Sequence, residues 1–151
     1  MHIAMYSPAW PANKHSNGII TYVQHMRTEL MRQGHRVTLL TGVVDDEDLG
    51  PDIRRISKRG TLGERILRKF GLVGPNNWGH AIGREILDIH RRTPVDVVEV
   101  EESFGWCKDL QEKIPMPVIV KLHGPAFLDM VEGRDTPEGE KKMADEGAAL
   151  H

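Results

Sequence analysis

The pair Asn17-Gly18 is the feature of the sequence with the clearest potential for chemistry, because it stands directly before a helical pattern. A glycine lets the backbone approach a ligand closely, and the first turn of a helix offers unpaired N–H groups at a positive dipole end. We therefore expect a phosphate or diphosphate to be the natural occupant. The alternative, equally open at this point, is that Gly18 only serves the turn. The chain has neither a G-x-G-x-x-G nor a Walker A lysine motif, so ordinary dinucleotide or ATP binding is disfavoured.

Several other polar segments follow apolar runs that predict strands. If these runs form an open parallel sheet, ligands bind beyond the carboxyl ends of its strands. The segments that we expect at this edge are residues 7–18, the turn after Gly42, the loop near Asp52, Glu101-Glu102-Ser103 and His123-Gly124-Pro125. This placement follows from the fold class and not from any motif.

Metal binding has little support in the sequence. Asp46-Glu47-Asp48 matches the short D-x-D pattern in which two carboxylates can hold a divalent cation, but the pattern is common by chance and lies in an acidic turn. Cys107 is the only cysteine, which excludes an internal disulfide and a cysteine metal cage. The histidines other than His123 lack zinc-like spacing. We expect no metal site.

Residues 54–70 are markedly basic, and Leu62, Ile66 and Phe70 share one face of the helix that their spacing predicts. A basic amphipathic helix can lie on an anionic membrane or meet a lipid-linked or phosphorylated acceptor. The interpretation that we favour is a surface helix whose apolar face packs on the domain, with weak peripheral membrane contact as the alternative.

The elements that must position these residues are short strands alternating with helices. The pattern predicts strands at residues 3–6, 37–41, 53–56, 95–100 and 118–122, and helices at residues 19–31, 62–70, 75–92, 103–114 and 136–150. Ser7-Pro8 should end the first strand, and Asn17 and Gly34 should delimit the first helix. The last two strands are nearly continuous β-branched runs, typical of strands covered on both faces. The alternation predicts an α/β fold, namely a doubly wound, mainly parallel Rossmann-like sheet with helices on both faces.

Composition is that of a globular domain, with 39% hydrophobic and 28% charged residues. Aromatic residues make up only 5%, which predicts an aliphatic core. The formal net charge of -2 gives no global attraction to nucleic acid. No apolar run approaches the ~20 residues of a membrane-spanning helix, and the first residues lack the basic region of a signal peptide. We expect a cytoplasmic protein.

Four motifs in the same order resemble the N-terminal domain of family-four glycosyltransferases, the retaining GT-B-fold enzymes of group 1 type. These motifs are residues 16–23, Gly34-His35-Arg36-Val37 with the strand after it, residues 94–99 and residues 118–124. The resemblance spans nearly the whole chain. It departs from the family at Asn17, where the usual first glycine of a Gly-Gly pair is missing, and we expect the turn to survive because Asn tolerates left-handed backbone.

The resemblance implies a nucleotide-sugar-dependent transferase of hexosyltransferase type, of which this chain is the acceptor-side half. Asn17 and Gly18 would lie against the donor diphosphate. His123 would be the catalytic-site residue, near the transferred sugar and its hydroxyl partners, unless it is only a turn histidine bonded to nearby backbone. No metal or other cofactor is implied, since the nucleotide sugar is a co-substrate.

Acceptor contacts are expected from Thr21, Tyr22, Glu102 and Lys121, and Glu101 shares their edge. Tyr22 could equally pack beside the first strand, and for Glu101, Glu102 and Lys121 a solvated surface charge is the more ordinary interpretation. The acceptor would be a small molecule or a glycan or lipid-linked acceptor.

The pattern after Thr136-Pro137 is a helix start without a following strand. We interpret residues 1–151 as one acceptor-side domain that is incomplete at its C-terminus, with the donor-binding domain absent, so the fragment alone should be inactive. Two alternatives remain open: a non-catalytic acceptor-recognition module that pairs with a separate donor-binding chain, and a flavodoxin-like domain unrelated to sugars.

Overall fold

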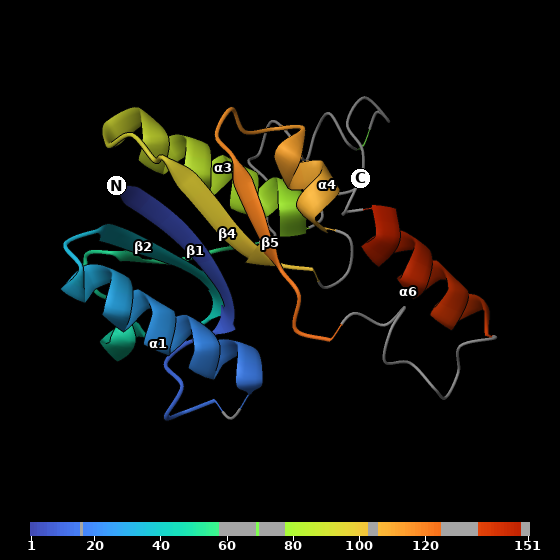
Figure 1. Ribbon diagram of the computed structural model, residues 1–151, viewed down its shortest axis with the longest axis horizontal. Helices are drawn as coiled ribbons and strands as arrows, with labels where there is room; N and C mark the ends of the chain where they lie inside the picture. The colour runs from blue at the N-terminus through green and yellow to red at the C-terminus, as the bar shows by residue number, and fades with distance from the viewer. Residues whose placement is uncertain (16, 58–68, 70–77, 103–105, 125–135, 149–151) are drawn as a thin grey trace.

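The computed structural model describes residues 1–15, 17–57, 69, 78–102, 106–124 and 136–148. Its elements are β1 (His2–Ala9), α1 (Gly18–Arg32), β2 (Arg36–Val43), the 3-10 turn η1 (Asp46–Asp48), β3 (Ile53–Arg55), α3 (Trp78–Arg92), β4 (Val97–Glu101), α4 (Trp106–Gln111), β5 (Val118–Lys121) and α6 (Pro137–Ala148). The five strands are parallel in the order β3-β2-β1-β4-β5, and helices lie on both faces of the sheet (Figure 1). The predicted doubly wound, Rossmann-like α/β fold is confirmed.

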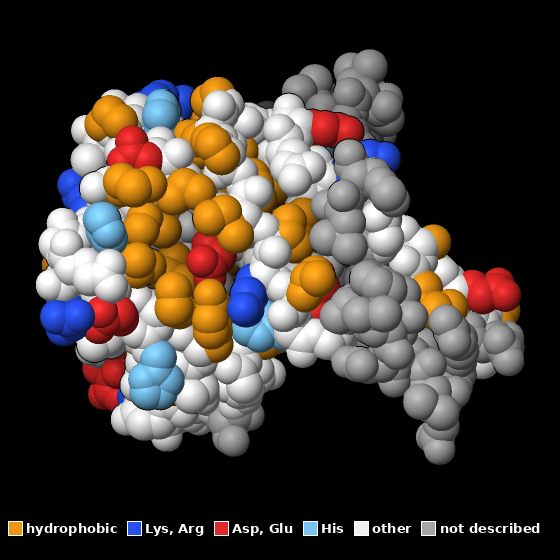
Figure 2. Space-filling view, viewed as in Figure 1, with side chains coloured by type: hydrophobic (Ala, Val, Ile, Leu, Met, Phe, Trp, Pro, Cys, Tyr) orange, Lys and Arg blue, Asp and Glu red, His pale blue; other side chains and the backbone are white. Residues whose placement is uncertain are grey.

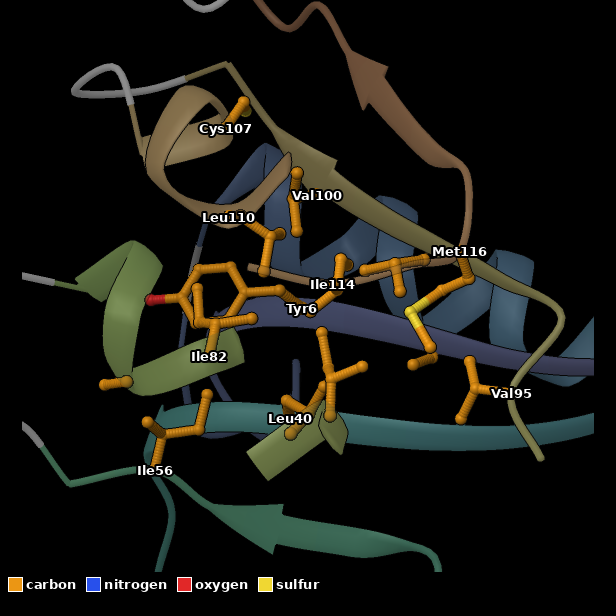
Figure 3. Packing of buried hydrophobic residues seen from close by; sticks show 14 residues of the cluster. Tyr6, Leu40, Ile56, Ile82, Val95, Val100, Cys107, Leu110, Ile114 and Met116 are labelled. Atoms are coloured by element: carbon orange, nitrogen blue, oxygen red, sulfur yellow. The ribbon is translucent and has the colours of Figure 1, made fainter. Parts of the chain in front are cut away.

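Each face of the sheet has its own hydrophobic layer, because successive side chains of a strand point to opposite faces. On one face α1 packs Val23 against Met5 and Leu39. On the other face α3 and α4 cover the strands, and Figure 3 shows this layer. Its buried members include Ala4, Tyr6, Leu40, Ile56, Ile82, Ile86, Val98, Val100, Cys107 and Leu110.

The low aromatic content predicted a purely aliphatic core, and this prediction is wrong. Tyr6 is 3% exposed, and its ring lies 6.3 Å from that of Trp78 and 5.8 Å from that of Trp106, between centroids. Gly42 makes room for this group, since a Cβ there would lie only 2.6 Å from Cη2 of Trp78. The glycine therefore lies inside β2 as a packing residue, beyond the predicted end of this strand at residue 41.

Both ends of α1 match the prediction. The Asn17 side chain accepts a hydrogen bond from the N–H of Ile19 at 2.8 Å, which is an N-cap. Gly34 has a φ of 86°, and His35 donates its N–H to the carbonyl of Leu30 at 3.0 Å. This left-handed residue and the bond across the last turn form a Schellman ending, which explains the glycine.

Two predicted boundaries are wrong for reasons that involve proline. β1 continues through Ser7-Pro8, because Ser7 and Ala9 stay paired with β2 while pairing with β4 stops at Met5. A proline can occupy a position where one neighbouring strand is missing. α4 ends at Gln111, before Ile114, since the residue that precedes Pro115 is disfavoured in a helix.

The prediction that β4 and β5 are covered on both faces is wrong for β5. The register pairs Met5 with Glu99 and Glu99 with Ile119, so Ile119 shares the face of α1. Its side chain is 50% exposed there, because α1 packs on β1 and β2, whereas β5 is the edge strand beyond β4. Figure 2 shows hydrophobic side chains exposed on this face.

α6 begins as predicted, with the Thr136 hydroxyl accepting the N–H of Gly139 at 3.1 Å, and it lies apart from the sheet (Figure 1). The predicted helix at residues 62–70 lies outside the described residues except for residue 69. The first residues of the predicted helices at 75–92 and 103–114 also lie outside them. The membrane-contact hypothesis for residues 54–70 therefore stays a prediction. Within the described ranges, no helix has both the length and the apolar character that crossing a membrane requires.

Candidate functional site

The loops after β1, β4 and β5 converge at the carboxyl end of the sheet, where the fold class predicts a ligand. They enclose a cleft of about 270 Å³ lined by Asn17, Gly18, Ile19, Glu102, His123 and Gly124. The cleft brings the start of α1 next to the segment that follows β5, as expected. Small-molecule sites usually measure roughly 300–1,000 Å³, so this volume suits one sugar- or phosphate-sized group.

The first turn of α1 forms one wall of this cleft. Asn17 has a φ of -158°, which is extended backbone, so the expectation that this residue needs left-handed tolerance is wrong. Its side chain already uses the N–H of Ile19. Gly18 has open space around it: apart from its chain neighbours and the backbone of its own helix, no described atom lies within 4 Å of the position that a Cβ would take. The turn therefore does not require a glycine, which favours the interpretation that the open space serves a ligand.

His123 forms the opposite wall, and Glu102 holds it in place. The N–H of His123 donates to both carboxylate oxygens of Glu102, at 3.0 and 3.1 Å. Glu102 is only 2% exposed and Glu101 5%, so the interpretation of these two residues as solvated surface charges is wrong. Gly124, the next residue, has a φ of 125°, in the left-handed region that favours glycine.

The His123 ring also contacts the side chain of Tyr22. The two ring centroids lie 5.1 Å apart at 72°, an edge-to-face arrangement. The Lys121 ammonium lies 5.1 Å above the Tyr22 ring, and Lys121 is otherwise exposed. Tyr22 therefore both packs beside the strands and borders the site, which unites the two interpretations of this residue.

Glu99 is a member of this group that the sequence did not single out. It forms a hydrogen bond with the Tyr22 hydroxyl, and burial together with the Glu99 charge raises the pKa of Tyr22 to about 12. Tyr22 therefore stays protonated at neutral pH and donates to the carboxylate. The signal in the sequence that could have indicated Glu99 is its position as a charged residue inside an otherwise apolar strand.

Thr21 does not line the cleft. Its hydroxyl donates to the carbonyl of Asn17 at 3.1 Å, within the first turn of α1. The structure therefore gathers Asn17, Gly18, Tyr22, Glu102, Lys121 and His123 around one edge and gives Thr21 a bond within its own helix.

Two buried reactive groups among the described residues near the site, Cys107 and Tyr6, are not activated as nucleophiles. Burial is the main cause that raises the pKa of the Cys107 thiol to about 11, and its Sγ donates to the carbonyl of Glu101 at 3.2 Å. Burial likewise raises the pKa of the Tyr6 hydroxyl far above its usual value. Both groups stay protonated at neutral pH and act in packing.

The loop near Asp52 lies at the other edge of the sheet, so the prediction that it joins the site is wrong. Asp52 precedes β3, and its carboxylate lies 3.6 Å from a guanidinium nitrogen of Arg36, at the start of β2. Residues before a parallel strand lie at the amino edge, opposite to the ligand edge.

The acidic turn at η1 surrounds a lysine of this chain. The Lys14 ammonium lies 2.7 Å from the Asp48 carboxylate and 3.4 Å from that of Asp45, and it also contacts Glu47. These hydrogen bonds raise the pKa of Lys14. The three carboxylates lie close enough together to hold a cation, and Lys14 supplies one.

The Lys14→Met variant should make the stability of the chain depend on Ca²⁺, because it keeps the length of the side chain but removes the charge that the carboxylates surround. At about 10 mM Ca²⁺ we expect its melting temperature to rise by about 2 to 6 °C, and that of the native chain to stay unchanged. Differential scanning fluorimetry measures both. Lys108→Met, at an exposed position of α4, is the matched control; an equal Ca²⁺ response of the native chain would contradict the argument.

No protein-family model matches this chain, and no curated protein has significant similarity to it.

Proposed function

We propose that this chain is the acceptor-side domain of a retaining, nucleotide-sugar-dependent glycosyltransferase of the GT-B type. The observation that carries the proposal is the cleft that joins the open first turn of α1, at Gly18, to His123. The family resemblance assigns these same two positions to the donor diphosphate and to the transferred sugar. The all-parallel sheet, with its ligand edge at this cleft, is the architecture that such a domain needs.

In this proposal α1 stabilises the leaving diphosphate. Charge develops on the leaving oxygen as the sugar-phosphate bond breaks towards an oxocarbenium-like state, and fixed N–H donors with a helix dipole stabilise it without reorganisation. Gly18 contributes because its missing side chain leaves the backbone accessible. The diphosphate would then be held without a metal ion from this domain.

His123 would bind hydroxyl groups of the sugars. Its backbone is held by Glu102 and its ring by Tyr22, so the imidazole is preorganised and needs no ordering when the ligand arrives. Glu102 acts here as a positioning residue, since its carboxylate is buried and already accepts the His123 N–H. The residues that select the nucleotide would lie in a donor-binding domain, so we expect no transfer activity from this chain alone.

The proposal can be tested by titrating the ¹⁵N-labelled chain with inorganic pyrophosphate at constant ionic strength. We expect amide shifts at residues 18–20 and at His123 and Gly124, which mark the cleft. Shifts confined to the arginine side chains at the amino edge of the sheet, or no shifts, would contradict it. Flavin mononucleotide is the second ligand, because tighter binding of the flavin than of pyrophosphate would favour a flavodoxin-like domain.

A further inference from the structure

The charges of the described residues are divided between the two edges of the sheet. At the carboxyl edge, carboxylates lie in the turn after β2 and at the end of β4, accompanied by three cationic side chains: Asp45, Asp46, Glu47, Asp48, Glu99, Glu101 and Glu102, with Lys14, Arg55 and Lys121. At the amino edge lie Arg36, Arg54 and Arg92, with Asp52, Asp88 and Asp96. The small net charge of the whole chain therefore conceals an acidic ligand edge.

The same excess of negative charge holds directly around the cleft. Glu102 lines the cleft itself. Glu99 and Glu101 line the recess next to it, together with Tyr22, His123 and Lys121. Three carboxylates thus face one ammonium group, and no arginine is among the described residues that line either space.

Lys121 does not cancel this excess. Its ammonium lies over the ring of Tyr22, whose hydroxyl donates to Glu99. Both carboxylate oxygens of Glu102 already accept the N–H of His123. Among the described residues that line the cleft, the first turn of α1 supplies further positive potential, and the proposed function assigns its N–H groups to the donor diphosphate.

Carboxylate oxygens accept hydrogen bonds from hydroxyl and ammonium groups and repel other anions. We propose that the acceptor bound at this edge is a sugar without an acidic group, with an amino sugar favoured over a neutral one and a phosphorylated sugar disfavoured. The inference rests on the proposed function, because it concerns the acceptor of that same site. A bound donor diphosphate strengthens the discrimination, since it adds a second anion beside the acceptor.

The test compares glucosamine, glucose and glucose 6-phosphate in ¹⁵N NMR titrations of this chain saturated with inorganic pyrophosphate, so that the first turn of α1 is occupied and cannot bind the phosphate group of the sugar. A mildly acidic pH keeps the amine protonated. The amides of His123 and Gly124 report on the cleft. At about 20 mM salt we expect glucose 6-phosphate to bind about tenfold more weakly than glucose, and glucosamine several-fold more tightly. Both differences should shrink at about 300 mM salt, where surface charges are screened over a shorter distance.

Glu99→Gln removes one charge and keeps an oxygen that can accept the Tyr22 hydroxyl. We expect this substitution to strengthen the binding of glucose 6-phosphate and to weaken the binding of glucosamine, each by about threefold, while the affinity for glucose stays unchanged. Glu112→Gln makes the same charge change at an exposed position after α4, where it should have no effect on any of the three.

The two hypotheses fail in different ways. If glucose 6-phosphate shifts the cleft amides at least as strongly as glucose, the inference about the acceptor is wrong and the proposed function stands. If all three sugars and pyrophosphate leave these amides unchanged, the proposed function itself fails.

Discussion

Replacing Leu40 with alanine should lower the free energy of unfolding by about 2 to 5 kcal/mol, which is a large part of the roughly 5–15 kcal/mol typical of a domain. Leu40 is 0% exposed and belongs to the hydrophobic layer under α3 and α4. In the sheet it is paired with Tyr6 of β1 on one side and Arg54 of β3 on the other (Figure 3 shows its neighbours). Truncation therefore leaves a cavity that strands on both sides prevent from collapsing.

Guanidinium chloride unfolding, followed by tryptophan fluorescence, measures the change. Leu49→Ala is the matched control, because it removes the same atoms from a side chain that is 39% exposed in the loop before β3, and we expect a change within about 0.5 kcal/mol. A loss below about 1 kcal/mol for Leu40→Ala, with an unchanged denaturant slope, would mean that this layer is not packed as described.

The sequence predicts the fold class well because hydrophobic periodicity and helix signals are local. Asn17 and Gly34 delimit α1 through bonds that stay within a few residues of each other. Boundaries were wrong where the deciding partner is distant in sequence. β1 passes through Pro8 because of its pairing with β2, and β5 keeps one face exposed because α1 packs elsewhere.

The candidate site could be predicted only as far as the rule for parallel sheets extends. That rule places Gly18 and His123 at one edge of the sheet, and both residues line the same cleft there. It does not say whether a carboxylate in a loop is buried, so Glu102 was interpreted as solvated, although it is buried and accepts the N–H of His123. Asp52 was misplaced because it precedes its strand.

Interactions of charged side chains with residues far away in the sequence could not be predicted either. Lys14 meets three carboxylates that lie more than thirty residues away. Glu99 of β4 accepts a hydrogen bond from the hydroxyl of Tyr22, which lies on α1. Nothing in local spacing or composition indicates either contact, since both depend on how α1 and the loops sit on the sheet.

Gly18→Ala should separate the ligand-binding role of this glycine from a structural one. Gly18 begins α1 with open space around its Cα and no left-handed backbone, so alanine fits without strain and the melting temperature should stay the same or rise slightly. The added methyl group projects into the space where a phosphate would approach the backbone. Loss of one charge-assisted hydrogen bond should then weaken pyrophosphate binding about ten- to a hundredfold.

Gly34→Ala is the control at the other end of the same helix. Its φ of 86° strains any residue with a Cβ, so we expect about 1 kcal/mol of lost stability and unchanged pyrophosphate binding. The two glycines should thus show opposite behaviour, one affecting only the ligand and the other only the fold. If Gly18→Ala destabilises the chain like Gly34→Ala and binds pyrophosphate normally, Gly18 is a turn residue, and the diphosphate role assigned to the first turn of α1 must be abandoned.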